Sequence, residues 1–121
     1  MEVTLKYRRM RKTDRIYISG PISGDPVKAR HNFARVERWL RWNKYDDVIN
    51  PEKMLREHAR TMTHGELLHI CRSLVETSDV VLLLEGWEES TGASMEAGMA
   101  LALGRLVLEI REDGTLHELN Y

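Results

Sequence analysis

The sequence predicts a three-layer α/β fold, in which a mostly parallel sheet carries helices on both faces. Apolar runs of strand length alternate along the chain with longer segments whose apolar residues recur at helical spacing. The run Asp79–Leu84 is apolar after its first residue, which is typical of a strand covered on both faces. Because strands that alternate with helices pair in parallel, these patterns indicate a flavodoxin- or Rossmann-like architecture in the broad sense.

Each expected element has a local signal. The segment Arg15–Gly20 alternates apolar and polar residues, and the apolar residues of Lys28–Lys44 recur on one helical face. The residues Glu112–Gly114 predict a hairpin-type turn before a short tail. The expected strands are Arg15–Gly20, Asp47–Asn50, Asp79–Leu84 and Leu106–Ile110. The expected helices are Lys28–Lys44, Pro51–Arg60, His64–Thr77 and a fourth that Ser90 or Thr91 caps and that runs to about Leu103.

Length and composition indicate one domain. The 121 residues are 42% hydrophobic and 31% charged, which suffices for a core and a polar surface. We expect a basic N-terminal arm at residues 1–14 and a single domain at residues 15–121. The arm is interpreted as a contact for phosphate or nucleic acid, or as a solvated extension or edge strand. We favour the second interpretation, because terminal arms are usually loosely held.

Net charge and cysteine content restrict the partners and the compartment. A net charge of -1 argues against a dedicated nucleic-acid or membrane binder, and no apolar run approaches the length of a membrane span. The single cysteine, Cys71, cannot form an internal disulfide, so we expect a cytoplasmic protein. We expect no cofactor and no metal, because His58, His64 and His69 are not spaced to share one helix face.

Two loops rich in glycine and hydroxyl residues follow expected strands, at Gly20–Asp25 and Gly86–Gly92. In a parallel sheet such loops meet above one crevice at the carboxyl ends of the strands. Glycine permits close approach to the backbone, and free N–H groups at a helix start attract anions. Neither loop matches the P-loop or the GxGxxG fingerprint. The residues alone therefore indicate a small anionic ligand, such as a nucleotide phosphate.

The same loops resemble the nucleoside 2-deoxyribosyltransferase superfamily. The matching motifs are YISGPISG at residues 17–24, VINP at residues 48–51, Asp79, and GWEESTGASME at residues 86–96. The similarity spans roughly Arg15 to Ile110 and is closest to a short bacterial and phage branch, largely of unassigned function. The superfamily includes nucleoside 5′-monophosphate N-glycosidases. The resemblance implies a nucleotide or nucleoside as partner and a homo-oligomer, in which sites often borrow residues from a neighbouring subunit.

Glu96 matches the superfamily's nucleophilic carboxylate. Cleavage of an N-glycosidic bond builds positive charge on the anomeric carbon, which a carboxylate stabilises or traps as an ester. We place Glu96 in the first turn of its helix, where the helix N-terminus would keep it ionised. The alternative is that it only completes a capping arrangement. Tyr17 matches a tyrosine that faces the active site in the family. The alternative is that Tyr17 is an aromatic residue on the strand face that packs against a helix.

The resemblance also implies residues that hold the substrate. Ser90 stands where the transferases usually carry an aspartate and the nucleotide hydrolases carry a serine that contacts the 5′-phosphate. A hydroxyl donates to a phosphate that an aspartate would repel, so Ser90 favours a monophosphate, although it is equally interpreted as an ordinary N-cap. Ser23 and Gly24 match positions that contact phosphate or sugar. The expected binding residues are Gly20, Ser23, Gly24, Trp87, Ser90 and Gly92. Trp87 is the one that could stack on a base.

Cys71 departs from the family pattern. Family enzymes commonly place an aspartate there to protonate the leaving base, and a neutral thiol is a poor general acid. Either His69 or Glu66 supplies the proton, or activity is weak or absent.

Together, the residues and the resemblance predict an N-glycosidase acting on a (deoxy)nucleoside 5′-monophosphate. The alternatives are a nucleotide-binding sensor on the same fold and, third, a nucleoside deoxyribosyltransferase.

Overall fold

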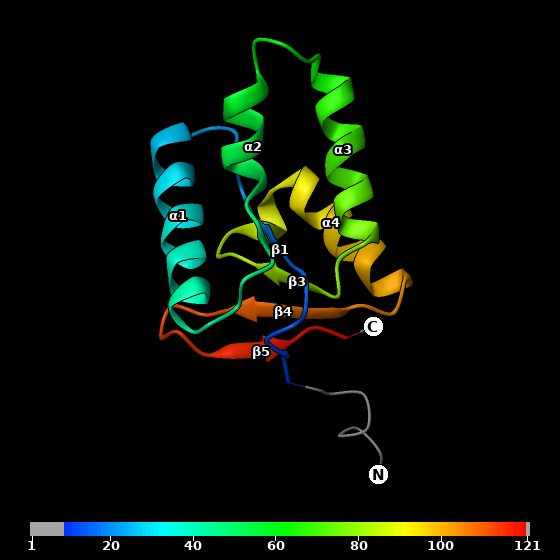
Figure 1. Cartoon of the computed structure of the whole chain (residues 1–121). Helices are drawn as coiled ribbons and strands as arrows, with labels where there is room; N and C mark the ends of the chain where they lie inside the picture. Colours follow the sequence, from blue (N-terminus) through cyan, green and yellow to red (C-terminus); the bar gives the residue numbers. More distant parts are fainter. Residues whose placement is uncertain (1–8, 121) are drawn as a thin grey trace.

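A five-stranded sheet forms the middle layer of the protein (Figure 1). The computed structural model describes residues 9–120, so most of the expected N-terminal arm lies outside the described residues. The strands are β1 (Ile16–Ser19), β2 (Val48–Ile49), β3 (Val80–Leu83), β4 (Leu106–Ile110) and β5 (Leu116–Glu118). The helices are α1 (Pro26–Trp42), α2 (Pro51–His58), α3 (His64–Glu76) and α4 (Thr91–Ala102), and a short 3-10 helix, η2 (Trp87–Glu89), precedes α4.

The strand order is β2-β1-β3-β4-β5, and the first four strands are parallel. The predicted α/β class and all four predicted strands are therefore confirmed. The expected short tail after the turn at residues 112–114 is instead β5, which pairs antiparallel with β4. The tail has few apolar residues, so its own sequence carries a weak strand signal; pairing with the exposed edge of β4 supplies the stabilisation.

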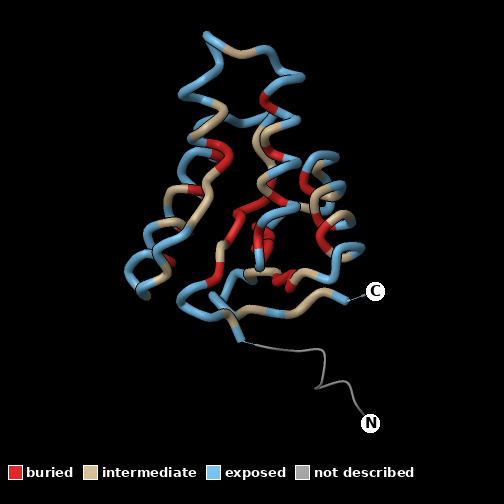
Figure 2. Tube along the Cα trace, turned by 45° about the vertical axis from the view of Figure 1, so that its right-hand side comes forward, coloured by how far each residue is buried: buried red, intermediate tan, exposed pale blue. Residues whose placement is uncertain are grey.

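Two apolar cores lie on opposite faces of the sheet. The strands β1 and β3 in the middle of the molecule are buried along their whole length (Figure 2). Because side chains alternate along a strand, Ile16 and Ile18 point towards α1, where they meet Phe33. Tyr17 points to the other face and packs with Cys71 of α3. The second core also contains Val75, Val81, Leu83, Ala97, Ala100 and Val107. Helices α3 and α4 therefore cover the face of the sheet that carries Tyr17.

A side chain caps each helix at its N-terminus. Asp25 caps α1, Asn50 caps α2, and Thr63 forms a reciprocal capping box at α3. Ser90, rather than Thr91, is the N-cap of α4, where its Oγ accepts from the N–H of Ala93 at 3.2 Å. Within residues 9–120, no helix is long and apolar enough to cross a membrane.

The two glycine-rich loops pack against one another above the sheet. A Cβ on Gly20 would lie 2.8 Å from the Cβ of Leu84, and a Cβ on Gly86 would lie 3.3 Å from Cγ of Pro21. Gly86 also has a φ of +85°, which a side chain would strain. These contacts bring the loop after β1 and the loop after β3 together at the carboxyl edge of the sheet, as the sequence predicted.

Candidate functional site

Two hydroxyl groups hold the carboxylate of Glu96. The hydroxyl of Tyr17 donates to Oε2 of Glu96 at 2.7 Å, and Oγ of Ser19 donates to Oε1 at 2.7 Å. Tyr17 and Ser19 are two residues apart on β1, so both side chains reach the same face of the sheet. Both residues are buried, while Glu96 is only half-buried. Glu96 is therefore a fixed carboxylate with an exposed side.

The charge state of this cluster follows from its burial. Burial raises the pKa of Glu96 above its usual value, and the hydrogen bonds from Ser19 and Tyr17 offset part of that shift. Burial, together with the nearby charge of Glu96, also raises the pKa of Tyr17 far above its ordinary value. Tyr17 is thus a neutral donor, and Glu96 binds its proton more tightly than a solvated glutamate does.

The position of Glu96 on α4 corrects one expectation. Because α4 begins at Thr91, Glu96 lies in the second helical turn, and the first turn of α4 contains no acidic residue. The favourable effect of a helix N-terminus on a carboxylate is confined mainly to the first turn. Burial therefore outweighs any effect of the helix N-terminus on the pKa of Glu96. A capping role for Glu96 is excluded because the third helical position is Ala93 and the carboxylate of Glu96 bonds to Tyr17 and Ser19.

Cys71 lies beside the Tyr17–Glu96 pair. It belongs to the same apolar cluster as Tyr17 and is 4% exposed. Burial raises the pKa of its thiol, and the hydroxyl of Tyr17 partly offsets this effect. The position expected to protonate a leaving base thus carries a neutral thiol. Of the two substitutes suggested by the sequence, Glu66 is occupied at the start of α3, where its Oε1 accepts from the N–H of Thr63 at 2.8 Å.

A cleft of about 1240 Å³ opens on the other side of the joined loops. The first turn of α4 borders it with Ser90, Thr91 and Gly92, and the loop after β1 contributes Ser23. One face of α1 forms the facing wall with Lys28, Asn32, Arg35 and Trp39. Glutamates line the wall that belongs to η2 and the β4–β5 hairpin; they are Glu85, Glu88, Glu89 and Glu112.

The expected site residues therefore fall into separate groups. Tyr17 and Glu96 come together, while Ser23, Ser90 and Gly92 line the cleft. Gly20 is buried and serves loop packing, and Gly24 is an exposed turn residue with a φ of +100°. Trp87 donates from Nε1 to Oε2 of Glu109 at 2.7 Å and lies outside the large cleft, in a smaller one.

Sequence reasoning missed Ser19, Lys28 and Arg35. Strand alternation could have found Ser19, because it is two residues beyond Tyr17. The seven-residue spacing of Lys28 and Arg35 could have placed them on one side of α1. Within the part of the chain that the structure describes, no group of three or more His, Cys, Asp or Glu side chains could hold a metal ion.

The raised pKa of Glu96 predicts a pH-dependent stability. The folded protein binds this proton more tightly than the unfolded chain, whose glutamates titrate near pH 4.3. The stability that protonated Glu96 confers is therefore complete below that value and is lost as the pH rises through the folded pKa. We expect urea unfolding to show wild type losing stability relative to Glu96→Gln as the pH rises above the ordinary pKa of a glutamate. If the difference in stability between wild type and Glu96→Gln did not change with pH, the raised pKa of Glu96 would be contradicted.

The chain is similar to one protein family in sequence and to a solved structure in fold. A family model with the description "Domain of unknown function (DUF4406)" matches residues 14–109. Among solved structures, the fold is similar to a 2-desoxiribosyltransferase from Leishmania mexicana, with a TM-score of 0.57 and 20% sequence identity. That alignment covers 88% of this chain and 78% of the other. No curated protein matches the sequence. The chain therefore has a nucleoside deoxyribosyltransferase-like fold.

Proposed function

The chain belongs to the DUF4406 family, and from its fold and its fixed carboxylate we propose that it is an N-glycosidase acting on a (deoxy)nucleoside 5′-monophosphate. One observation carries the proposal. Helix α4 borders the large cleft with its first turn and carries Glu96 in its second. Ser90 and Glu96 are six residues apart, about 9 Å along the helix axis. Glu96 does not line the cleft, so the proposal requires a ligand that reaches from Ser90 past the joined loops to Glu96.

The first turn of α4 suits a phosphate. The first N–H groups of a helix have no partner within the helix, and the hydroxyl of Ser90 keeps its own hydrogen to donate while its oxygen accepts from the N–H of Ala93. Lys28 and Arg35 stand across the cleft, and within residues 9–120 neither side chain is paired with a carboxylate. Because the oxygen of Ser90 accepts the capping bond and its hydrogen can be donated, Ser90 can cap α4 and contact a phosphate at the same time.

In the proposed reaction, ionised Glu96 attacks the anomeric carbon as the bond to the base breaks. The electron pair of that bond leaves with the base, which takes up a proton, and a glycosyl ester forms on Glu96. Water then attacks the same carbon and returns the carboxylate, with overall retention of configuration. Tyr17 and Ser19 hold Glu96 for attack, and the ester reduces the charge that burial disfavours.

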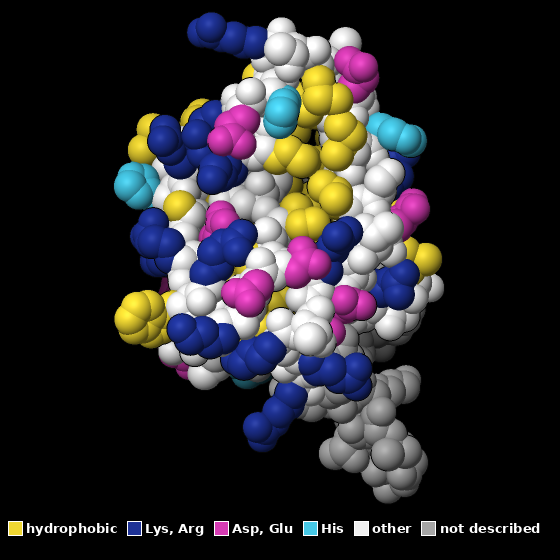
Figure 3. All heavy atoms as spheres, in the orientation of Figure 1, with side chains coloured by type: hydrophobic (Ala, Val, Ile, Leu, Met, Phe, Trp, Pro, Cys, Tyr) yellow, Lys and Arg dark blue, Asp and Glu magenta, His cyan; other side chains and the backbone are white. Residues whose placement is uncertain are grey.

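The face of the sheet that carries Tyr17 offers a place for the base. Met54 and Leu55 of α2 pack at the edge of the cluster that contains Tyr17 and Cys71. Hydrophobic side chains gather between α2 and α3 around a hollow (Figure 3). An apolar groove of this kind suits the faces of a nucleobase.

A panel of ribo- and deoxynucleoside 5′-monophosphates tests the proposal. We expect chromatography to show release of free base from at least one nucleotide, and slower release from the matching nucleoside, which lacks the phosphate. Binding of a nucleotide without release would instead favour the nucleotide-binding sensor. Equal release from nucleoside and nucleotide would remove the role proposed for Ser90.

The substitution Cys71→Asp tests the missing general acid. A carboxyl group at this position can protonate a leaving base, and general acid catalysis contributes about 10²- to 10⁴-fold. We expect the rate of base release to rise at least tenfold at slightly acidic pH. Cys71→Asn, which is similar in size but is no acid, should show no gain. An unchanged rate in Cys71→Asp with an intact circular dichroism spectrum would contradict the argument.

The sensor remains a second candidate function because Cys71 leaves the expected acid position without a carboxyl group. A deoxyribosyltransferase is disfavoured by Ser90, as the sequence already indicated. We also propose that the chain forms a homo-oligomer. In support, Met95 and Leu103 of α4 are 64% and 45% exposed, and Leu68 of α3 is 46% exposed.

A further inference from the structure

Charge is unevenly distributed along the chain. The net charge of -1, from which we expected no nucleic-acid partner, conceals regions of opposite sign. Residues 9–44 contain 10 Lys and Arg but 3 Asp and Glu, whereas residues 45–121 contain 6 and 15. The first region is the segment before β1, β1 itself and α1 with its flanking loops. A strongly basic surface is therefore present in a protein whose net charge is near zero.

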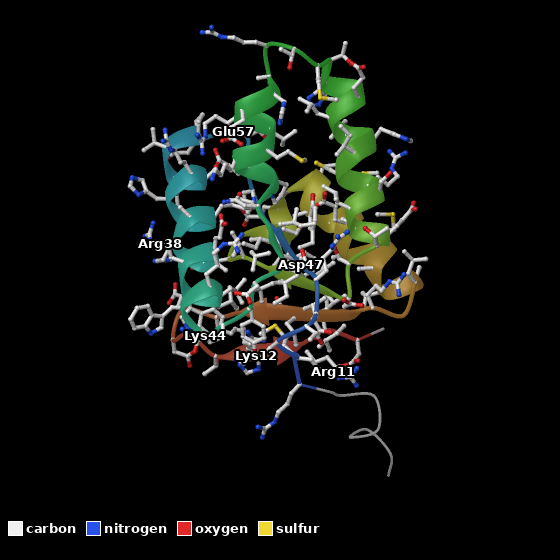
Figure 4. The ribbon with its side chains drawn as sticks, viewed as in Figure 1. Arg11, Lys12, Arg38, Lys44, Asp47 and Glu57 are labelled. Atoms are coloured by element: carbon white, nitrogen blue, oxygen red, sulfur yellow. The ribbon has the colours of Figure 1, made fainter. Side chains whose placement is uncertain are left out.

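Part of this charge lies on the side of the molecule seen in Figure 4. Lys44 just after α1, and Lys12 and Arg11 before β1, lie towards the lower end of the molecule in this view, and Arg38 lies above them on α1 (Figure 4). Lys12 is held there: its Nζ donates to the carbonyl of Asn43 at 2.6 Å and lies 3.9 Å from the ring centre of Tyr45. We call Arg11, Lys12, Arg38 and Lys44 the basic face.

Acidic neighbours do not neutralise the basic face. Within residues 9–120, no carboxylate forms an ion pair with any of its four side chains. Asp47 is nearby but pairs with Arg15, at 3.2 Å between Oδ2 and Nε. Glu57 lies on α2, towards the opposite end of α1 from Lys44 (Figure 4). Unpaired like charges repel one another, and a polyanion relieves that repulsion.

An aromatic side chain accompanies these cations. Trp42 is 84% exposed and lies one turn beyond Arg38 on α1, two residues before Lys44. Trp39, in the preceding turn, is 38% exposed. Cations that follow a phosphate backbone, combined with an exposed aromatic ring on which a base can stack, are the features of surfaces that bind single strands.

We propose that the basic face and Trp42 bind single-stranded nucleic acid without sequence preference. The four cations contact backbone phosphates, and Trp42 stacks on an unpaired base. A duplex has no base free to stack, so it binds more weakly at equal charge. None of the four cations lines the cleft, and neither does Trp42, so the inference does not depend on the proposed function.

Fluorescence anisotropy with a labelled 20-nucleotide oligothymidylate tests the proposal. At 50 mM salt we expect a Kd of roughly 1 to 100 µM, within the range of non-specific binding. With four phosphate contacts, log K should fall with log salt at a slope of about -3. Removing the ring in Trp42→Ala should weaken binding about tenfold, because a base stacked on an aromatic ring contributes that order of affinity.

The charge-reversed double variant Arg11→Glu, Arg38→Glu should lose at least tenfold in affinity and reduce the magnitude of the salt slope. Arg60→Glu, an exposed residue after α2, is the matched control and should bind as wild type does. Glu96→Gln should also bind normally, which separates this surface from the proposed active site. The milder pair Arg11→Gln, Arg38→Gln serves if the reversed variant does not fold. Absence of binding at 50 mM salt, equal binding by the double variants, or a duplex bound as tightly would each overturn the proposal.

Discussion

Replacing Glu96 with glutamine is expected to reduce base release by at least about a thousandfold while nucleotide binding persists. Removing a nucleophile leaves only the rate enhancement that comes from positioning and electrostatics, so losses of this order or greater are typical. Glutamine preserves the volume of the side chain, and its carbonyl still accepts a hydrogen bond from Ser19 or Tyr17. The loss should therefore appear in kcat, with a small change in KM.

Two controls make this result specific to the carboxylate. Glu89→Gln changes an acid that lines the cleft without approaching Tyr17, and it should retain base release. Nucleotide binding by Glu96→Gln, measured by calorimetry, should stay within a few-fold of wild type. Full activity in Glu96→Gln would exclude Glu96 as nucleophile. Loss of binding together with activity would indicate that Glu96 mainly holds the ligand.

The substitution Gly20→Ala is expected to destabilise the protein by about 1 to 3 kcal/mol, as overpacking of a filled site typically does. The added methyl group would lie 2.8 Å from Cβ of Leu84, a distance that requires the backbone to move. Gly20 directly follows Ser19, so the same movement should disturb the hydrogen bond from Ser19 to Glu96. Urea unfolding measures the stability, and the assay for base release measures the second effect.

Gly98→Ala provides the matched control for Gly20→Ala. Gly98 lies on an exposed position of α4, and a Cβ there would meet no atom within 4 Å. Alanine in the interior of a helix should stabilise the protein by roughly 0.5 to 1 kcal/mol. Opposite signs for the two substitutions would show that crowding at Leu84, rather than loss of glycine itself, destabilises Gly20→Ala. Equal stability of Gly20→Ala and wild type would contradict the close contact between the loops.

Local patterns were enough to predict most of the fold. The apolar run that became β3 and the helical spacing of Phe33, Val36 and Leu40 depend on near neighbours in the chain, so the sequence alone reveals them. The strand β5 was missed because its stability comes from pairing with β4 rather than from its own residues. The direction of the pKa shift of Glu96 was missed for a related reason, since burial is a property of the packed helix and sheet.

The sequence by itself determined the α/β class and the two glycine-rich loops, because periodicity and turn composition are local properties. The choice of Glu96 and Tyr17 came from the resemblance of its motifs to a known family. Only the tertiary structure decided that Ser19 also holds Glu96, and that burial raises the pKa of this carboxylate. It likewise decided that Ser90 and Gly92 line a cleft, whereas Trp87 is bound to Glu109. Hydrogen bonds between residues 22 to 79 positions apart, and the exclusion of water around them, arise only when the chain packs.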